Sequence, residues 1–315
     1  MEIPEWKDVL EAYTRIKSRV HYTPVFTCSA INRISGCEIF FKCENFQKTG
    51  AFKFRGASNA VLSLEQPQAE KGVATHSSGN HAAALALAAQ NRGIPAFIVM
   101  PETAPRVKKD AVSSYGGEIV YCTPTLEARE STLKAVVKRT GAAFIHPYNN
   151  FDVICGQATA AIELLEEIKD LDVVVVPVGG GGLLSGTAIT VTNLSQGTKI
   201  IAAEPKNADD AFRSFKSGVL QPPLKPGTVA DGLLTALAPL TFSIVMEYVD
   251  DIFCAREDSI INAMRFIWER MKIIIEPSAA VPLAAILEHR GFFYGRRVGI
   301  IITGGNVDLT DQRFI

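Results

Sequence analysis

The 315-residue chain lacks the features that mark several common protein classes. Its 6 cysteines are scattered without a C-x-x-C pair, which argues against a zinc site or a redox dithiol, and we expect reduced thiols. No apolar run reaches the ~20 residues that a membrane span needs. Residues 1–17 carry acidic side chains and amphipathic spacing in place of a basic start and an apolar core. We therefore expect a cytoplasmic protein that does not associate with membranes.

Charge runs, repeats and low-complexity stretches are also missing. The chain has 32 Lys and Arg against 33 Asp and Glu, for a formal net charge of −1, and no basic cluster. Nucleic acid is therefore a poor partner, and a small polar metabolite is the better one. Hydrophobic residues make up 47% of the sequence, which is enough for more than one core.

Apolar strand-like runs alternate with helical patterns over most of the chain. This rhythm is typical of βαβ units and predicts an α/β fold with parallel sheets. The runs are too many for one small sheet, and they lie at residues 73–77, 96–101, 118–122, 143–147, 173–178, 200–205, 251–255 and 297–302. Helical patterns follow several of them, at residues 82–90, after Pro105, and at 126–139, 159–168 and 183–191.

Four glycines, residues 179–182, separate the β-branched run 172–178 from the helical pattern 183–191. Bare backbone N–H groups at such a strand-to-helix loop can close around a phosphate at the helix N-terminus. The loop is not a P-loop, because Leu183, Leu184 and Ser185 follow it where that motif needs Gly-Lys-Ser/Thr. A flexible turn without a ligand is the alternative interpretation.

Lys53 lies between Phe52 and Phe54, with Gly50 and Gly56 close by. Aromatic neighbours and close backbone approach predict a desolvated amine, whose proton affinity is lowered. Only a neutral amine attacks an aldehyde, so this environment suits a Schiff-base lysine. The alternative is an exposed lysine near a helix start.

Residues 77–81, Ser-Ser-Gly-Asn-His, form a second loop that precedes a helical pattern. Asn80 can donate a hydrogen bond to a ring hydroxyl, the free N–H groups can hold a carboxylate, and the serine hydroxyls can pass protons. Helix capping by Ser or Asn would need no ligand and is the alternative. His81 is ambiguous in the same way, with a structural histidine as its simpler role.

Thr303 ends the strand-like run 297–302 and precedes two glycines, which places a hydroxyl at the C-terminal edge of a sheet, where ligands of open α/β sheets bind. A neutral hydroxyl facing a pyridine nitrogen would leave that nitrogen largely unprotonated. The four segments are those around Lys53, at residues 77–81, at residues 179–182 and at Thr303. Together they offer an amine, a polar loop, an anion-binding loop and a neutral hydroxyl. That combination fits pyridoxal phosphate.

Four further segments carry a family resemblance: residues 41–50, 203–205, 230–232 and 276–278. With the cofactor segments, they make the chain similar, from about residue 12 to residue 309, to the fold-type II pyridoxal phosphate enzymes. Within these it resembles the serine racemases and serine/threonine dehydratases, including the hydroxyaspartate dehydratases. The resemblance implies a homodimer of two-domain subunits, each domain an open, mostly parallel twisted sheet, with the cofactor between them. It also implies the boundaries: residues 1–71 and 148–315 for the large domain and 72–147 for the small one.

The resemblance assigns the cofactor contacts. It implies that Lys53 forms the Schiff base, Phe52 packs near the ring, Asn80 bonds the ring hydroxyl, and Thr303 takes the place of the family's usual serine at the pyridine nitrogen. It also implies that the phosphate is bound by Gly179, Gly180, Gly181, Gly182 and Leu183.

Substrate contacts follow from the same resemblance. It places four residues around the substrate carboxylate, namely Ser77, Asn80, His81 and Arg129. Thr235 stands where a serine is common in the animal racemases. Ser78 stands where plain threonine dehydratases commonly have alanine, so its hydroxyl favours racemisation, with Lys53 and Ser78 exchanging the Cα proton on opposite faces of the substrate.

The resemblance further implies a divalent cation, Mg²⁺, Mn²⁺ or Ca²⁺, held by Glu204, the backbone carbonyl of Ala208 and Asp210. Without the resemblance, the two carboxylates would be interpreted as a solvated acidic surface. Some relatives bind ATP, and six residues match that site: Ser29, Lys48, Thr49, Tyr115, Lys272 and Asn306. Ala83 and Tyr148 depart from the animal pattern, which counts against activation by ATP.

These observations predict a serine racemase that also eliminates water from serine to give pyruvate and ammonia. A dehydratase for threo-3-hydroxyaspartate or threonine is the enzymatic alternative. A sensor that binds pyridoxal phosphate or an amino acid without turnover is an alternative from another class, and the intact Lys53 and Ser78 count against it.

Overall fold

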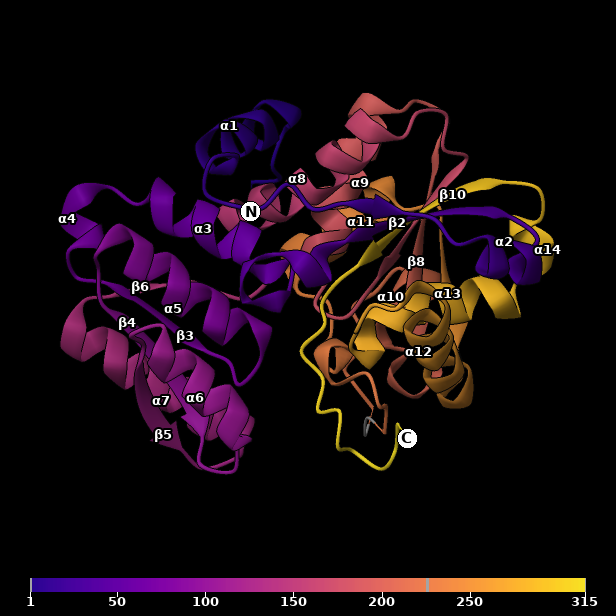
Figure 1. The fold of residues 1–315 in the computed structure, drawn as a ribbon. Coiled ribbons are helices and arrows are strands. Elements are labelled where there is room, and N and C mark those ends of the chain that lie inside the picture. Colours follow the sequence, from indigo (N-terminus) through magenta and orange to yellow (C-terminus); the bar gives the residue numbers. More distant parts are fainter. Residues whose placement is uncertain (1, 225–226, 315) are drawn as a thin grey trace.

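The computed structural model describes residues 2–224 and 227–314, which form an α/β protein with two separate sheets (Figure 1). The larger sheet has 6 strands in the order β1-β2-β10-β7-β8-β9, and only the pair of β1 with β2 is antiparallel. Its strands are β1 (Val25–Phe26), β2 (Glu38–Cys43), β7 (Val173–Pro177), β8 (Lys199–Pro205), β9 (Asp251–Ala255) and β10 (Arg297–Ile302). The predicted fold class is confirmed.

The smaller sheet has 4 parallel strands in the order β5-β4-β3-β6. Its elements are β3 (Val73–His76), α5 (Asn80–Arg92), β4 (Ala96–Pro101), α6 (Arg106–Ser114), β5 (Glu118–Cys122), α7 (Leu126–Thr140) and β6 (Ala143–Phe144). All of them lie within residues 72–147, the segment expected to form the small domain. The boundaries themselves stay a prediction.

The remaining elements surround the larger sheet or connect the two sheets. The helices are α1 (Trp6–Ile16), α2 (Ser29–Ser35), α3 (Lys53–Ser63), α4 (Gln66–Ala69), α8 (Phe151–Glu167), α9 (Gly182–Leu194), α10 (Asp210–Ser217), α11 (Pro239–Tyr248), α12 (Glu257–Met271), α13 (Pro277–Glu288) and α14 (Arg290–Phe293). Four short 3₁₀ turns are η1 (Glu44–Phe46), η2 (Lys48–Gly50), η3 (Lys206–Ala208) and η4 (Asp231–Leu233). Among the helices of the described residues, none combines the length and apolar character of a membrane-spanning segment.

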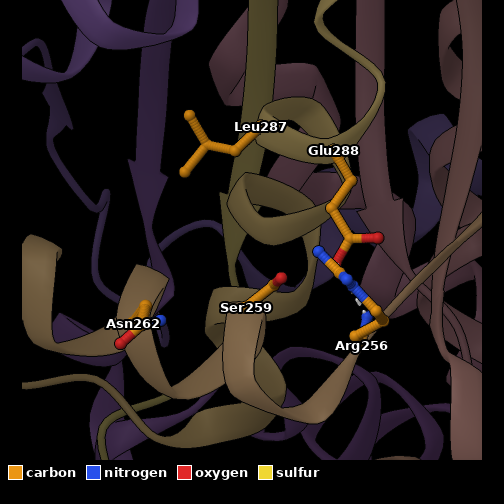
Figure 2. A pocket seen from close by; sticks show the side chains of 5 residues that line it. All are labelled: Arg256, Ser259, Asn262, Leu287 and Glu288. Carbon is orange, nitrogen blue, oxygen red and sulfur yellow. Dashed lines mark hydrogen bonds and ion pairs between the residues drawn. The ribbon is translucent and has the colours of Figure 1, made fainter.

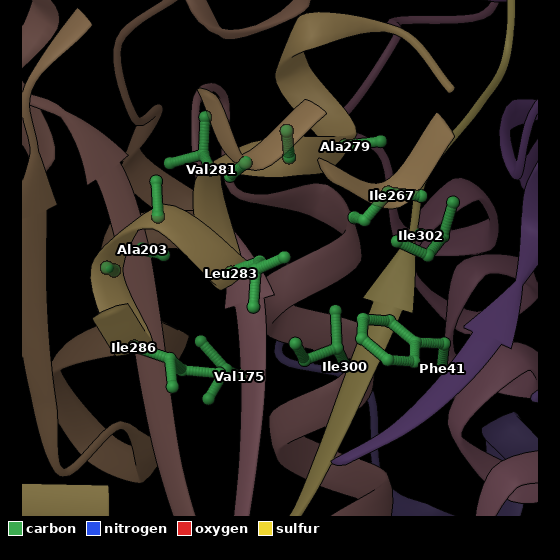
Figure 3. Packing of buried hydrophobic residues seen from close by; sticks show 14 of the residues in the cluster. Phe41, Val175, Ala203, Ile267, Ala279, Val281, Leu283, Ile286, Ile300 and Ile302 are labelled. Carbon is green, nitrogen blue, oxygen red and sulfur yellow. The ribbon is translucent and has the colours of Figure 1, made fainter. Parts of the chain in front are cut away.

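Apolar side chains cover both faces of the larger sheet, as expected for parallel strands. On one face, Val175 and Ile300 pack beneath Leu283 of α13 and Ile267 of α12 (Figure 3). On the other face, the alternate strand residues belong to a second cluster that includes Leu184 of α9. The central strand β7 is buried along its whole length, so the start of the glycine loop that follows it is held in place by the core.

Helix α8 is the buried support for two helices that carry predicted site residues. A Cβ atom on Gly156 of α8 would lie 2.6 Å from Cα of Gly56 in α3, and a Cβ atom on Gly186 of α9 would lie 2.6 Å from the carbonyl oxygen of Ile154 in α8. Only glycines permit such close approach of helix backbones. The sequence pattern indicated helix over residues 159–168 only, and the structure shows that the helix begins at Phe151.

Helix α3 joins the two halves of the molecule. Its residues Phe54, Ala57 and Val61 are buried in one apolar cluster with Val73 of β3 and Leu85 of α5. This face of α3 packs with the smaller sheet and its helices (Figure 1). Its first turn, however, is held by the larger sheet, because the Phe52 N–H donates to the carbonyl oxygen of Thr303 at 2.9 Å.

Candidate active site

Lys53 opens helix α3, and its ammonium donates to the carbonyl oxygen of Pro147 at 2.9 Å. The nitrogen lies 5.1 Å from the centroid of the Phe52 ring. Burial lowers the pKa of Lys53 to about 8, while the negative charge of Glu276 acts in the opposite direction. The amine is therefore far easier to deprotonate than an ordinary lysine near neutral pH.

Glu276 is the residue that sequence reasoning missed, since it was noted only as part of a family segment and given no role. It is 5% exposed and stands immediately before α13, and burial raises its pKa to about 7. Its two carboxylate oxygens accept from the Asn80 side-chain amide at 3.0 and 3.1 Å. The signal that could have found it is a single charged residue inside the apolar stretch 273–286.

Asn80 links the two sheets at this point. It is the first residue of α5, and besides donating to Glu276 its side-chain oxygen accepts from the Asn306 amide at 2.9 Å. Asn306 also donates to the carbonyl oxygen of Thr49 at 2.8 Å. The loop after β10 and the start of α5 are thereby joined next to Glu276, whose N–H donates to the carbonyl oxygen of Gly304 at 3.0 Å.

The glycine loop lies between β7 and α9, as the sequence predicts, and is completely buried. A Cβ atom on Gly180 would come within 2.4 Å of the Tyr148 ring, and Gly181 adopts a φ of +85°. Side chains are therefore excluded, and the N-terminus of a 13-residue helix faces the loop. This arrangement fits a phosphate, which the loop N–H groups and the helix dipole would both stabilise.

Thr303 provides an independent test of the fit. The residue is 3% exposed, and its hydroxyl has no hydrogen-bond partner within residues 2–224 and 227–314. Ser185, in the first turn of α9, also has a buried hydroxyl with no partner in the described part of the chain. Buried polar groups are nearly always satisfied, so these two hydroxyls mark places that a polar ligand would complete. The residues present therefore fit pyridoxal phosphate.

The predicted substrate residues do not all share one environment. Ser77 accepts from the Gly79 N–H at 3.3 Å, whereas no hydrogen bond to another described residue holds the half-buried Ser78. His81 is buried with Nε2 3.3 Å from the Ile145 carbonyl oxygen, and burial lowers its pKa to about 3, so its ring is neutral.

The last two predicted substrate residues lie on different elements. Burial lowers the pKa of His76 at the end of β3, and the charge of Arg129, which lies on α7, acts in the same direction. Thr235 is exposed in the loop after η4, where its hydrogen bond with Tyr148 opposes the rise in the Tyr148 pKa that burial causes.

The predicted cation residues come together at the end of β8. Glu204 accepts from the N–H groups of Ala211 and Phe212, both at 2.8 Å, and burial raises its pKa to about 9. Burial also raises the pKa of Asp210 to about 6, and one of its carboxylate oxygens lacks a partner among the described residues. Two buried carboxylates with an unused oxygen fit a hard cation. No group of three His, Cys, Asp or Glu side chains suited to a metal occurs in residues 2–224 and 227–314, so the carbonyl of Ala208 would have to complete this site.

Hydrogen bonds connect only some of the six residues predicted to bind ATP. The Lys48 ammonium donates to the Arg19 carbonyl oxygen at 2.7 Å, and Lys48 adjoins Thr49, which accepts from Asn306. No hydrogen bond among the described residues joins these to the others, which are Ser29, Tyr115 and Lys272. The nucleotide site stays a prediction.

A surface cavity of about 500 Å³ lies at a different place, between the start of α12 and the end of α13 (Figure 2). Arg256 crosses it to donate to Glu288 at 3.3 Å. Its lining consists of Arg256, Ser259, Asn262, Leu287 and Glu288. None of the residues predicted to bind cofactor, substrate, cation or nucleotide lines it, so it is separate from the candidate active site.

Comparison with known proteins agrees with this geometry. A family model described as "Pyridoxal-phosphate dependent enzyme" matches residues 16–304. The chain belongs to this family. Its cofactor is therefore pyridoxal phosphate, and it is an enzyme of the fold-type II group that includes serine racemases and dehydratases.

Two curated relatives and one solved structure are similar to nearly the whole chain. The beta-hydroxyaspartate dehydratase of Paracoccus denitrificans is 53% identical over 309 residues, which cover 98% of both chains. The serine racemase of Dictyostelium discoideum is 52% identical over 308 residues, covering 96% of this chain and 95% of the relative. A crystal structure of serine racemase from the same organism aligns with a TM-score of 0.93 at 51% identity, covering 97% of this chain and 99% of the other.

Proposed function

We propose that this enzyme interconverts L-serine and D-serine and, as a side reaction, eliminates water from serine to give pyruvate and ammonia. One observation carries the proposal. Ser78 leaves a strand of the smaller sheet with a hydroxyl that no described residue holds, next to Asn80, which contacts the Glu276 carboxylate. Ser78 follows the smaller sheet, whereas the turn that carries Lys53 is held by the larger one, and a second acid/base group needs a free hydroxyl of this kind.

Bound pyridoxal phosphate supplies an electron sink that makes the Cα–H bond of an amino acid acidic. The Lys53 amine, with its lowered pKa, would remove the Cα proton from one face. Ser78 would deliver a proton to the other face, which inverts Cα. The loop N–H groups at residues 179–183 would hold the phosphate, and the Thr303 hydroxyl would face the pyridine nitrogen.

The balance between inversion and elimination depends on which bond changes first after Lys53 has taken the proton. Prompt proton delivery from Ser78 gives the other enantiomer, whereas earlier loss of the β-hydroxyl gives pyruvate and ammonia. We therefore expect Ser78→Ala to lower the formation of D-serine by about 10²-fold or more, the usual contribution of a positioned acid. Pyruvate formation from L-serine would continue.

The test is a product assay on cofactor-loaded protein, with D-serine measured by chiral chromatography and pyruvate measured in the same sample. Ser77→Ala is the matched control, because it removes the neighbouring hydroxyl in the same loop. It is expected to change both products by a similar factor and leave their ratio unaltered. A Ser78→Ala enzyme that keeps the parent's ratio of D-serine to pyruvate would rule out Ser78 as the second acid.

A dehydratase for threo-3-hydroxyaspartate is the second candidate, and the 53% identity to the Paracoccus denitrificans dehydratase favours it. The same preparation would be given serine and hydroxyaspartate separately at equal concentrations. A kcat/KM for hydroxyaspartate at least tenfold above that for serine would make dehydration of this substrate the main function. Comparable values, with D-serine formed, support the racemase.

A further inference from the structure

Four charged side chains are completely buried beneath helix α3: Lys42, Glu44, Arg55 and Glu163, none more than 2% exposed. They come from β2, η1, α3 and α8. Two positive and two negative groups give the cluster, called here the Arg55 network, a net charge of zero. Charges in such a place survive only when they are paired and fully hydrogen-bonded.

Arg55 is the centre of this network. Its guanidinium makes two hydrogen bonds to Glu44, at 2.7 and 2.8 Å, and two to Glu163, both at 2.7 Å. The Lys42 ammonium completes the cluster by donating to Glu163 at 2.6 Å and to the Thr23 carbonyl oxygen at 2.6 Å. Forked contacts of this kind fix a guanidinium in both distance and angle, which a lysine at the same position could not do.

The Arg55 network holds the turn of α3 that carries Lys53. Arg55 stands two residues after Lys53, and its N–H donates to the Phe52 carbonyl oxygen at 3.0 Å in the same turn. Next to it, the Gly56 N–H donates to the Gln157 side chain on α8 at 3.1 Å. The first turn of α3 is thus attached to η1 and α8, and through Glu163 to Lys42 of β2, a strand of the larger sheet.

Beyond its first turn, α3 contacts both parts of the molecule, and on one side the Asn59 side chain donates to the carbonyl oxygen of Asp152 on α8 at 2.8 Å. Phe54, Ala57 and Val61 are buried with side chains of the smaller sheet and its helix α5. Without the Arg55 network, fewer contacts would hold the first turn of α3 to the larger sheet and to α8. Apolar packing would then draw α3 towards the smaller sheet, and the ammonium of Lys53 would move away from the Pro147 carbonyl that it contacts at 2.9 Å.

We propose that Arg55 is a positioning residue for Lys53: its buried contacts with Glu44 and Glu163 hold the first turn of α3 against the larger sheet and so determine where the Lys53 amine stands. Four buried charges are a poor way to gain stability, because apolar side chains of similar volume do as well or better. What the network adds is specificity, because it holds helix α3 in one position. Arg55 acts through the backbone, since Glu276 is the charge that acts on the Lys53 amine.

The experiment measures the reactivity of Lys53 directly, in protein freed of its cofactor. Acetic anhydride would label the amines at a series of pH values, and mass spectrometry would quantify each lysine, with the exposed Lys71 as internal reference. The parent is expected to show a Lys53 midpoint well below that of Lys71. The inference depends on Lys53 being the reactive amine of the proposed function, and the parent profile tests that point separately from the variants.

The main variant carries Arg55→Met together with Glu44→Gln. It removes one charge of each sign and leaves the Lys42 and Glu163 pair, so the cluster stays neutral and the protein is expected to fold. With the turn released, the Lys53 midpoint should rise by one pH unit or more, which lowers its labelling near pH 7.5 by about tenfold. Arg55→Lys, which keeps the charge and loses the fork, should shift the midpoint in the same direction.

Val61→Ala is the matched control, because it weakens the same helix on the face that packs with the smaller sheet. It should lower the thermal midpoint of the protein without moving the labelling midpoint of Lys53. The proposal would be overturned if Lys53 had the same labelling midpoint in both Arg55 variants as in the parent. It would also be overturned if both Arg55 variants failed to fold while Val61→Ala folded. If Lys53 of the parent were no more reactive than Lys71, the assignment of Lys53 itself would fail, and the positioning role with it.

Discussion

The Arg55 network and the candidate active site are both buried and polar, and they differ in how completely their groups are paired. In the Arg55 network every charge has an opposite partner, and the guanidinium donates to two carboxylates and a threonine hydroxyl. In the candidate site, the hydroxyls of Thr303 and Ser185 have no partner within the described residues. The paired region holds the fold in one arrangement, and the unpaired region is where a ligand would complete the hydrogen bonding.

The carboxyl groups of the two regions also differ in what burial does to their pKa values. In the network, burial lowers the pKa of Lys42, but Arg55 holds the pKa of Glu44 below its usual range even though the carboxyl is buried. In the site, burial prevails and moves the pKa of Lys53 down to about 8 and that of Glu276 up to about 7. Perturbed groups of this kind gather where proton transfer is needed. The following predictions test this difference between the Arg55 network and the candidate active site.

Removal of the reactive amine should have the largest effect. Lys53→Ala is expected to lower kcat/KM on serine by about 10⁴-fold or more, as seen when the central group of a catalytic set is lost. The cofactor-free variant should be no less stable than the parent, because a desolvated amine has been removed. Steady-state kinetics and denaturant unfolding would measure the two effects, with Lys71→Ala as an exposed control. Retention of more than a tenth of parental activity would contradict the assignment.

Breaking the charge balance of the Arg55 network should lower the stability of the protein. Glu163→Gln leaves Arg55 and Lys42 facing a single carboxylate, and an uncompensated buried charge costs about 3–5 kcal/mol. Urea unfolding would measure the loss. Glu167→Gln, on the exposed side of the same helix, is the control and should stay within about 0.5 kcal/mol of the parent. Equal losses in the two variants would show that Glu163 is not a paired buried charge.

A divalent cation should stabilise the acidic pair at the end of β8. Saturation with Mg²⁺ or Ca²⁺ at about 100 times its Kd would add about 2.7 kcal/mol to the free energy of unfolding. The effect should be weaker at lower pH, because Glu204 and Asp210 hold protons more tightly than usual and the cation must displace them. Asp210→Asn should abolish the cation effect in thermal unfolding. The same stabilisation in parent and variant would place the cation elsewhere.

Glu276 should impose a pH dependence on stability that can be assigned by subtraction. Its pKa is raised to about 7 in the folded protein, so the folded state binds more protons than the unfolded one between about pH 4.5 and 7. Stability from this group is therefore present at low pH and falls as the pH rises through this window, by about 1–3 kcal/mol. The difference in unfolding free energy between parent and Glu276→Gln, measured at both ends, isolates this term from that of Glu204. A difference that does not change with pH would contradict the raised pKa.

Thr303→Val should have the smallest effect on the cofactor-free protein. It removes a buried hydroxyl that has no partner in the described part of the chain, so stability should be unchanged or higher by up to about 1 kcal/mol. Binding of pyridoxal phosphate, followed by absorbance titration, should become weaker. Serine at this position keeps the hydroxyl, so Thr303→Ser should retain parental affinity. A large loss of stability in Thr303→Val would mean that the hydroxyl is used within the fold.

Local patterns in the sequence predict much of the fold but only part of the site. The strands β4, β5, β9 and β10 have the bounds that their apolar runs indicate. For β4 and β10 the reason is that a parallel strand buried on both faces is a continuous apolar run. The run at residues 143–147 is different, since only Ala143 and Phe144 pair with β3. Past them the chain turns towards Lys53, whose ammonium contacts Pro147.

Contacts between distant residues explain what the sequence could not give. Glu276 is 196 positions from Asn80, and Arg55 is 108 from Glu163, so no local spacing marks either pair. Helix α8 begins earlier than its pattern indicated because residues 151–158 include β-branched residues and a glycine, which have low helix propensity. The glycine loop and Lys53 were found because glycine spacing and aromatic flanks are local features.

The most direct test of the account is the conversion of L-serine in deuterated water by the cofactor-loaded enzyme, with both enantiomers and pyruvate analysed together. We predict D-serine that carries one solvent deuterium at Cα, formed alongside pyruvate, because Lys53 removes the proton on one face and Ser78 supplies another on the opposite face. Pyruvate without any D-serine would contradict the racemase and assign the enzyme to dehydration.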